Sequence, residues 1–194
     1  MTKYLFFSGK GGVGKTTMAS ATAIHYAIEG EKTLIVTTDP ASNLADVFEQ
    51  AIGHKITSIT GIKNLYAMEI DPDEATREYK EKIIGPFRDI MPEDVLASIN
   101  EQLNGPCTTE MASFDRFIDF METDEYDVIV FDTAPTGHTI RLLELPVDWS
   151  KHIEESAKGS GQTCLGPVQT IQDSKDKYDR ATSLLKDTER TDEA

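Results

Sequence analysis

Long hydrophobic runs are missing from this sequence, and cysteines are few. No stretch approaches the ~20 apolar residues that a membrane-spanning helix needs. A signal peptide is also missing, because Met1-Thr2-Lys3 leads straight into a strand-length apolar run, so we expect a cytosolic protein. The two cysteines, Cys107 and Cys164, form no CxxC motif for zinc or redox chemistry. As reduced cytosolic thiols, they are most simply interpreted as small buried side chains.

Basic residues are outnumbered in this chain. The 194 residues include 19 Lys and Arg against 34 Asp and Glu, which gives a formal net charge of −15. Such a surface repels the nucleic-acid backbone, so nucleic acid is not an expected partner, but a local basic pocket for a small anion remains compatible. Because 39% of the residues are hydrophobic, the chain can bury a core and is not a disordered acidic segment.

Short apolar runs alternate with helical patterns along the chain. This alternation predicts an α/β fold, a largely parallel sheet flanked by helices. A mainly helical insertion, about residues 73–123, separates the third strand from the fourth. Its many apolar residues are explained either by packing on the sheet or by a ligand or partner surface. The expected strands are Lys3–Phe7, Thr33–Thr38, Leu65–Ile70 and Tyr126–Phe131, and the expected helices are Lys15–Glu29, Ala41–Gln50, Thr139–Leu145 and one from Pro167.

The turn after the first strand carries a phosphate-binding motif. Residues 9–16, GKGGVGKT, match G-x-x-x-x-G-K-[ST] between a strand and a helix, as in P-loop nucleotide-binding proteins. Backbone N–H groups and the helix N-terminus would hold the phosphates of ATP, Lys15 would reach the β- and γ-phosphates, and the Thr16 hydroxyl would ligate Mg²⁺. The alternative is a glycine-rich turn that binds no nucleotide. The residues expected at the nucleotide are Gly11, Gly12, Val13, Gly14, Lys15, Thr16 and Thr17.

Two aspartates follow expected strands. Asp39 comes after Thr33–Thr38, and Asp132 comes after Val128–Phe131. Ligands of open α/β sheets bind beyond the carboxyl ends of the strands, so both carboxylates are expected near the phosphate loop. One would serve Mg²⁺ and the other would orient or deprotonate the attacking water. The alternative is that each aspartate only caps a helix or turn.

Residues 10–17, KGGVGKTT, resemble the deviant Walker A loop of dimeric ATPases, which include chromosome-partition, septum-positioning, nitrogenase-reductase and arsenical-pump enzymes. In that resemblance Lys10 is the signature lysine that acts across the dimer on the phosphates of a neighbouring subunit. The alternative interpretation is that Lys10 is a solvated surface lysine. With Lys15 and Asp39, Lys10 completes the set of expected catalytic residues.

A second segment identifies the family more specifically than the phosphate loop does. Residues 132–143, DTAPTGHTIRLL, resemble switch II of arsenical pump-driving ATPases and of ATPases that target tail-anchored proteins, and residues 38–43, TDPASN, resemble their switch I. The resemblance implies that Asp39 positions the hydrolytic water near Mg²⁺ and that Asp132 contacts Mg²⁺ through water.

Two cysteine segments are similar to those of the arsenical pump ATPases. Residues 99–110 contain Cys107, and residues 164–167 contain Cys164; both resemble metalloid-binding segments of that family, and His138 matches a histidine of the same site. Trivalent arsenic and antimony are thiophilic, so thiols suit them. The resemblance implies that these residues bind arsenite or antimonite together with ligands from a second ATPase half. Without the resemblance, His138 would be interpreted as an ordinary structural histidine.

The resemblance implies a cytoplasmic ATPase that energises arsenite or antimonite efflux through a separate membrane permease, with which it associates peripherally. A second ATPase half or a homodimer partner is implied, and an arsenic metallochaperone is compatible. The alternative function is targeting of tail-anchored proteins on the helices of residues 73–123. We expect residues 1–191 to form a partial P-loop domain with 192–194 as a non-matching tail, and ATPase activity of this length of chain to be weak or absent.

Overall fold

A computed structural model of the chain describes residues 2–39, 43–133, 162–163, 166–167, 177, 179–187 and 190–193. The chain divides into two compact units. The sheet unit consists of Met1–Asp71, Phe120–Leu143 and Ser183–Ala194, and the helical unit of Pro72–Asp119 and Glu144–Thr182. The helix expected over Thr139–Leu145 lies outside the described residues.

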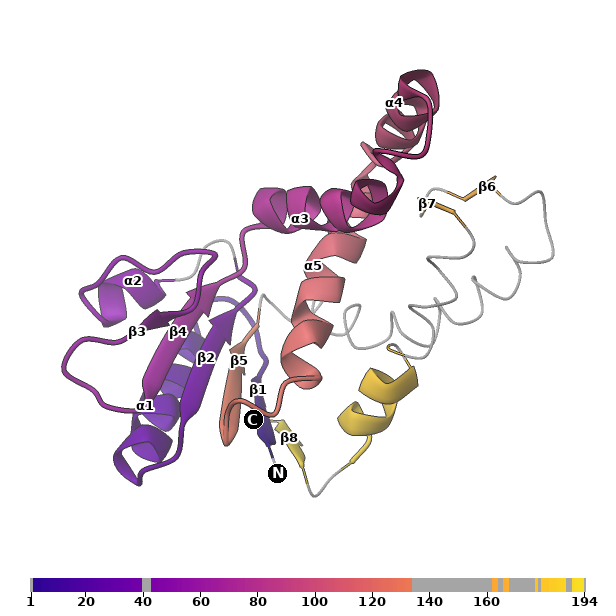
Figure 1. Cartoon of the computed structure of the whole chain (residues 1–194). Helices are drawn as coiled ribbons and strands as arrows, with labels where there is room; N and C mark the ends of the chain where they lie inside the picture. Colours follow the sequence, from indigo (N-terminus) through magenta and orange to yellow (C-terminus); the bar gives the residue numbers. More distant parts are fainter. Residues whose placement is uncertain are drawn as a thin grey trace. The chain divides into compact units, whose positions relative to one another are not determined.

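The sheet unit is built on four parallel strands, as the sequence predicts. β1 (Lys3–Phe7), β2 (Thr33–Thr37), β4 (Leu65–Glu69) and β5 (Val128–Asp132) lie in the order β4-β2-β5-β1 (Figure 1). Two short edge strands complete the sheet. β3 (Thr57–Ser58) runs antiparallel to β4, and β8 (Thr191–Glu193) runs parallel to β1. These two were not predicted, because two or three residues are too few to show a strand pattern.

The fourth strand extends further than its apolar run. β5 ends at Asp132 rather than at Phe131, because Asp132 is still in register with Phe7 of β1 and Thr37 of β2. Backbone hydrogen bonds even continue past the strand end: the Thr38 N–H donates to the Asp132 carbonyl at 3.1 Å. The polar residue that follows the apolar run is therefore part of the sheet.

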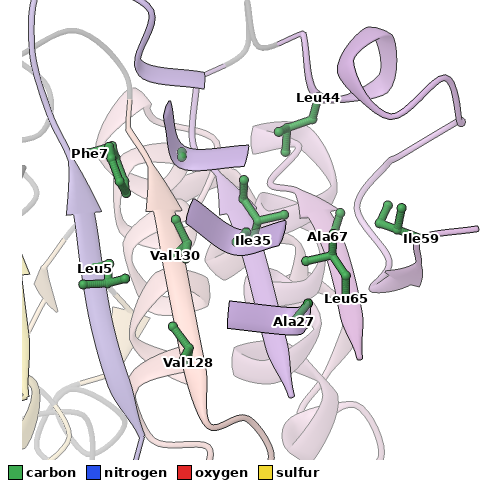
Figure 2. Packing of buried hydrophobic residues seen from close by; sticks show 12 residues of the cluster. Leu5, Phe7, Ala27, Ile35, Leu44, Ile59, Leu65, Ala67, Val128 and Val130 are labelled. Carbon is green, nitrogen blue, oxygen red and sulfur yellow. The ribbon is translucent and has the colours of Figure 1, made fainter. Parts of the chain in front are cut away.

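One face of this sheet packs against α1 (Lys15–Ile28). Helix α1 presents Ala19, Ala23 and Ala27, whose small side chains let it approach the strands closely. Figure 2 shows the strand residues on this face, which alternate along each strand as a pleated backbone requires. They include Leu5, Phe7, Ile35, Ala67, Val128 and Val130, joined by Leu44 from the short α2 (Leu44–Val47).

The opposite face of the sheet is aromatic. Phe6 and Phe131 stack with their ring centroids 4.8 Å apart, and both are buried. Tyr4 is fully buried, and its hydroxyl donates to the Met121 carbonyl at 2.8 Å. Both faces are thus covered, and each strand reads as a nearly continuous apolar run, as expected of a buried parallel sheet.

The helical unit confirms that residues 73–123 are mainly helical. It contains α3 (Pro72–Ile84), a 3₁₀ turn η1 (Gly85–Phe87), α4 (Glu93–Gln102) and most of α5 (Pro106–Met121), with a short hairpin of β6 (Gln162–Thr163) and β7 (Gly166–Pro167). Residues 179–185, within the helix expected from Pro167, are helical. Most of the large apolar side chains of the insertion are buried, which supports packing as their explanation. The buried ones are Ile83, Leu103, Met111, Phe114, Phe117, Ile118, Phe120 and Met121.

A buried ion-pair cluster joins three parts of the helical unit. The Lys177 ammonium lies 2.8 Å from Asp115 Oδ1 and 2.6 Å from Asp119 Oδ1, and the Lys82 ammonium lies 2.9 Å from Asp115 Oδ2. Burial by itself raises the pKa of Asp115, but the two lysines outweigh it, so the pKa lies below its ordinary value. Each oxygen of the Asp115 carboxylate therefore has an ammonium partner.

We expect Asp115→Asn to lower the free energy of unfolding by about 3 kcal/mol at pH 7, because it leaves buried Lys177 half-paired. Asp119→Asn is the matched control; its side chain is 39% exposed against 9% for Asp115, so its loss should cost less than about 1 kcal/mol. Since the folded pKa of Asp115 is lowered, its contribution is present above about pH 4 and fades as the pH falls below that. Urea unfolding at pH 7 and pH 3.5 measures both effects, and equal losses in the two variants would contradict the assignment.

Candidate functional site

The loop between β1 and α1 has the backbone of an anion site. Gly12 and Gly14 adopt φ values of +78° and +89°, which side-chain-bearing residues rarely adopt. Gly14 is also the N-cap of α1, where no side chain caps the helix and the first turn has no acidic residue. The N–H groups at this end of α1 therefore keep the partial positive charge that favours a phosphate.

Two lysines belong to this loop. The Lys15 ammonium reaches back over the loop and donates to the Lys10 carbonyl at 3.5 Å. The Lys10 side chain is exposed. The structure thus brings the Lys15 side chain, from the first residue of α1, back to the phosphate loop. The action of Lys10 on a neighbouring subunit stays a prediction.

Asp132 lies beside the first turn of α1. Its alternation with Val128 and Val130 directs it to the α1 face of the sheet, where the Thr16 hydroxyl donates to Asp132 Oδ2 at 2.8 Å. The residue is fully buried, and within the described part of the chain Oδ1 has no hydrogen-bond partner. Burial, the largest influence, raises the pKa of Asp132, and the charge of Asp39 adds to the rise. The Thr16 hydroxyl, the charge of Lys15 and the nearby Thr37 hydroxyl oppose it.

A buried carboxylate oxygen without a partner is costly unless a cation completes it. Mg²⁺ prefers hard oxygen ligands and combines one or two protein groups with phosphate oxygens. The Thr16 hydroxyl and the Asp132 carboxylate, next to a phosphate loop, form such a donor set. The residues present therefore fit a magnesium ion.

Thr37 and Glu69, which the sequence analysis did not single out, share this edge of the sheet. In the register of the strands Asp132, Thr37 and Glu69 stand side by side, and the Thr37 hydroxyl accepts the Asp39 N–H at 3.2 Å. Burial, followed by the charges of Asp71 and Asp39, raises the pKa of Glu69. The signal that could have revealed both residues is their place one position before the end of two predicted strands, Thr33–Thr38 and Leu65–Ile70.

Of the residues expected at the metalloid site, only Cys107 lies among the described residues. Cys107 is the second residue of α5, and His138 and Cys164 lie outside the described residues. Across the described ranges, no three His, Cys, Asp or Glu side chains are grouped so that they could hold a metal ion. Nor does any helix in those ranges have the length and apolar character needed to cross a membrane.

A parallel sheet with a glycine-rich loop between β1 and α1, and an aspartate ending the neighbouring β5, defines a P-loop nucleoside-triphosphatase fold. The family model described as anion-transporting ATPase matches residues 2–192, nearly the whole chain. The chain belongs to this family of ATPases.

The relatives of the chain carry different names. The chain is 52% identical over 190 residues to a putative arsenical pump-driving ATPase of Halobacterium salinarum, covering 98% of this chain and 29% of the relative. It is 49% identical to an arsenical pump-driving ATPase of Escherichia coli, covering 97% and 33%. It is 35% identical to ATPase GET3 of Kluyveromyces lactis, covering 86% and 51%. The chain therefore spans about a third of the length of the arsenical pump-driving relatives it matches.

Glu69→Gln is expected to raise the melting temperature of the nucleotide-free protein at pH 7 to 8. The raised pKa of Glu69 means that its charge opposes folding at pH values above its folded pKa, and this penalty disappears as the pH falls toward 4. The gain from the substitution should therefore shrink on acidification. Thermal unfolding between pH 4 and pH 8 measures it, with the exposed Glu31→Gln as control. A gain that does not change with pH would refute this origin.

Proposed function

We propose that this chain is the nucleotide-binding part of an ATPase that energises arsenite or antimonite efflux through a membrane permease. The observation that carries the proposal is the buried Asp132, whose Oδ2 accepts from Thr16 in the first turn after the phosphate loop, while its Oδ1 has no hydrogen bond of ordinary geometry among the described residues. Identity near 50% to ATPases named for driving an arsenical pump supports the metalloid as the coupled ligand. The chain's own permease and metallochaperone, and its cytoplasmic, peripheral location, belong to the same proposal.

The phosphates of ATP would bind the N–H groups of residues 11–17 and the ammonium of Lys15. Mg²⁺, when bound by Thr16 and by Asp132 directly or through water, would neutralise charge on the β- and γ-phosphates. Asp39, whose N–H is fixed by the Thr37 hydroxyl, would orient the attacking water and accept its proton. Lys10, exposed on the loop, would contribute charge to the phosphates of a second ATPase half.

Asp39→Asn in the full-length protein should lower kcat for ATP hydrolysis about 100-fold or more, since a neutral amide cannot take the proton. Affinity for Mg-ADP should change little, because Asp39 acts on the water rather than on the nucleotide. Steady-state hydrolysis and equilibrium ADP binding separate the two effects. Asp46→Asn, a change to an exposed carboxylate in α2, is the matched control. An unchanged kcat in Asp39→Asn would remove Asp39 from the reaction.

We further propose that Cys107, His138 and Cys164 bind As(III) or Sb(III). Cys107 is the second residue of the 16-residue α5, and thiols are the ligands that soft metalloids prefer. Asp132 and His138 are joined by only five residues of the segment that resembles switch II. A metalloid on His138 could thereby change the position of Asp132, which is a direct route from cargo to hydrolysis.

Antimonite should stimulate ATP hydrolysis by the full-length protein, and Cys107→Ser, Cys164→Ser and His138→Ala should each remove most of the stimulated increment. His25→Ala, which changes an exposed histidine of α1, should retain it. The measurement is the rate of phosphate release against antimonite concentration. A protein that hydrolyses ATP without any response to antimonite, with Cys107→Ser identical to wild type, would contradict the metalloid proposal and leave the ATPase proposal intact.

The targeting of tail-anchored proteins is the alternative, and relatives named ATPase GET3 keep it open. It requires an apolar groove on the helices of residues 73–123. Among the described residues of that range, only Ile90 and Val95 are large exposed hydrophobics. A hollow of about 390 Å³ between α3 and α4 has a mixed lining, in which the apolar Ile84, Leu96 and Ala97 lie among charged side chains such as Arg77 and Arg88. Crosslinking to a hydrophobic tail peptide discriminates the two functions.

A further inference from the structure

Two buried threonine hydroxyls tie β1 to β5, one at each end of the strand pair. At the amino end Thr2 Oγ1 donates to the Tyr126 carbonyl at 2.8 Å, and at the carboxyl end Thr133 Oγ1 donates to the Phe7 carbonyl at 2.7 Å. Each threonine is 2% exposed. The two bonds are chemically equivalent, but only the one at Thr133 is next to the candidate nucleotide site.

Thr133 holds two parts of that site at once. Its acceptor, Phe7, is the last residue of β1 before the phosphate loop, and Thr133 itself directly follows Asp132. The Thr133 N–H also donates to the Phe7 carbonyl, at 3.2 Å, so a single oxygen accepts both groups. The hydroxyl thus adds a second bond at the point where β5 leaves the sheet.

The position of the Asp132 carboxylate must be held closely if it is to bind magnesium. Its Oδ2 accepts from Thr16, its carbonyl accepts from the Thr38 N–H, and Oδ1 is left for a ligand. Magnesium requires nearly ideal octahedral geometry at about 2.0–2.1 Å, so a small displacement of the carboxylate relative to Thr16 weakens the site. Groups behind metal ligands that fix their orientation contribute about 10- to 100-fold to metal affinity.

We propose that Thr133 is a positioning residue for the magnesium–nucleotide site, its hydroxyl locking the end of β5 to the start of the phosphate loop. The inference rests on the proposed nucleotide function of Thr16 and Asp132. Thr2, at the other end of the same two strands, contributes to stability alone.

The test compares Thr133→Val with Thr2→Val in the full-length protein. Each variant loses one buried hydroxyl bond and keeps the side-chain shape, so both should melt at lower temperature by similar amounts. ADP binding is measured by calorimetry with Mg²⁺ and with EDTA. We expect Thr133→Val to lose about 10-fold of the Mg²⁺-dependent gain in affinity and Thr2→Val to keep all of it. Thr133→Ser, which retains the hydroxyl, should restore the gain.

Equal Mg²⁺-dependent gains in Thr133→Val and Thr2→Val would overturn the inference, and so would a loss of the same size with and without Mg²⁺. If valine at position 133 prevents folding, Thr133→Ala provides the same comparison against Thr2→Ala. Asp132→Asn distinguishes failure of the proposed magnesium site from failure of the role of Thr133. If it too keeps the full Mg²⁺ gain, the proposed site itself is wrong; if it loses the gain while Thr133→Val does not, only the role of Thr133 is wrong.

Discussion

The hydrogen bond from Thr16 to Asp132 is the interaction on which the arrangement of the site depends. It joins residues 116 positions apart, one in the first turn of α1 and one at the end of β5. The bond can form only because β5 pairs with β1, from which the phosphate loop leads to α1. The strand order β2-β5-β1 then brings the end of β2, with Thr37 and Asp39, to the other side of Asp132. The whole parallel core therefore serves to bring three chain segments to one carboxylate.

This arrangement carries a cost in the free energy of folding. A fully buried carboxylate with one unpartnered oxygen is a group that a stable core would exclude, and the half-buried Glu69 nearby adds like charge. The helical unit contains a buried aspartate whose charge is compensated, because Asp115 has a lysine ammonium beside each of its oxygens. The contrast between a matched and an unmatched buried aspartate, within one chain, is the reason for which we propose Asp132 as a site residue.

Much of this could be predicted from the sequence, and the part that could not has a physical reason. The four parallel strands, the phosphate loop and the place of Asp132 follow from apolar runs and a spaced glycine motif, which are local signals. Which residues lie next to Asp132 depends instead on the register between strands, which no local pattern of a single sequence shows. The register brings Thr37 beside Asp132 and Glu69 beside Thr37, and the hydroxyl of Thr133 reaches Phe7 on the neighbouring strand. The short edge strands β3 and β8 lack enough residues for a periodic pattern. The positions of His138 and Cys164 lie outside the described residues, so the metalloid ligands are still a prediction.

The charge of the chain gives a physical reason for the cation that we propose at the site. The chain has a net charge of −15, and the edge that would receive the nucleotide contributes Asp39, Glu69 and Asp132 against Lys10 and Lys15. A polyphosphate that approached this edge alone would meet repulsion that two lysines and a helix terminus only partly offset. A divalent cation between phosphate and Asp132 reverses the sign of that contact, because it turns a repelling oxygen into a ligand. The acidity from which we predict that nucleic acid is not a partner would therefore also favour the magnesium complex of the nucleotide over the free anion.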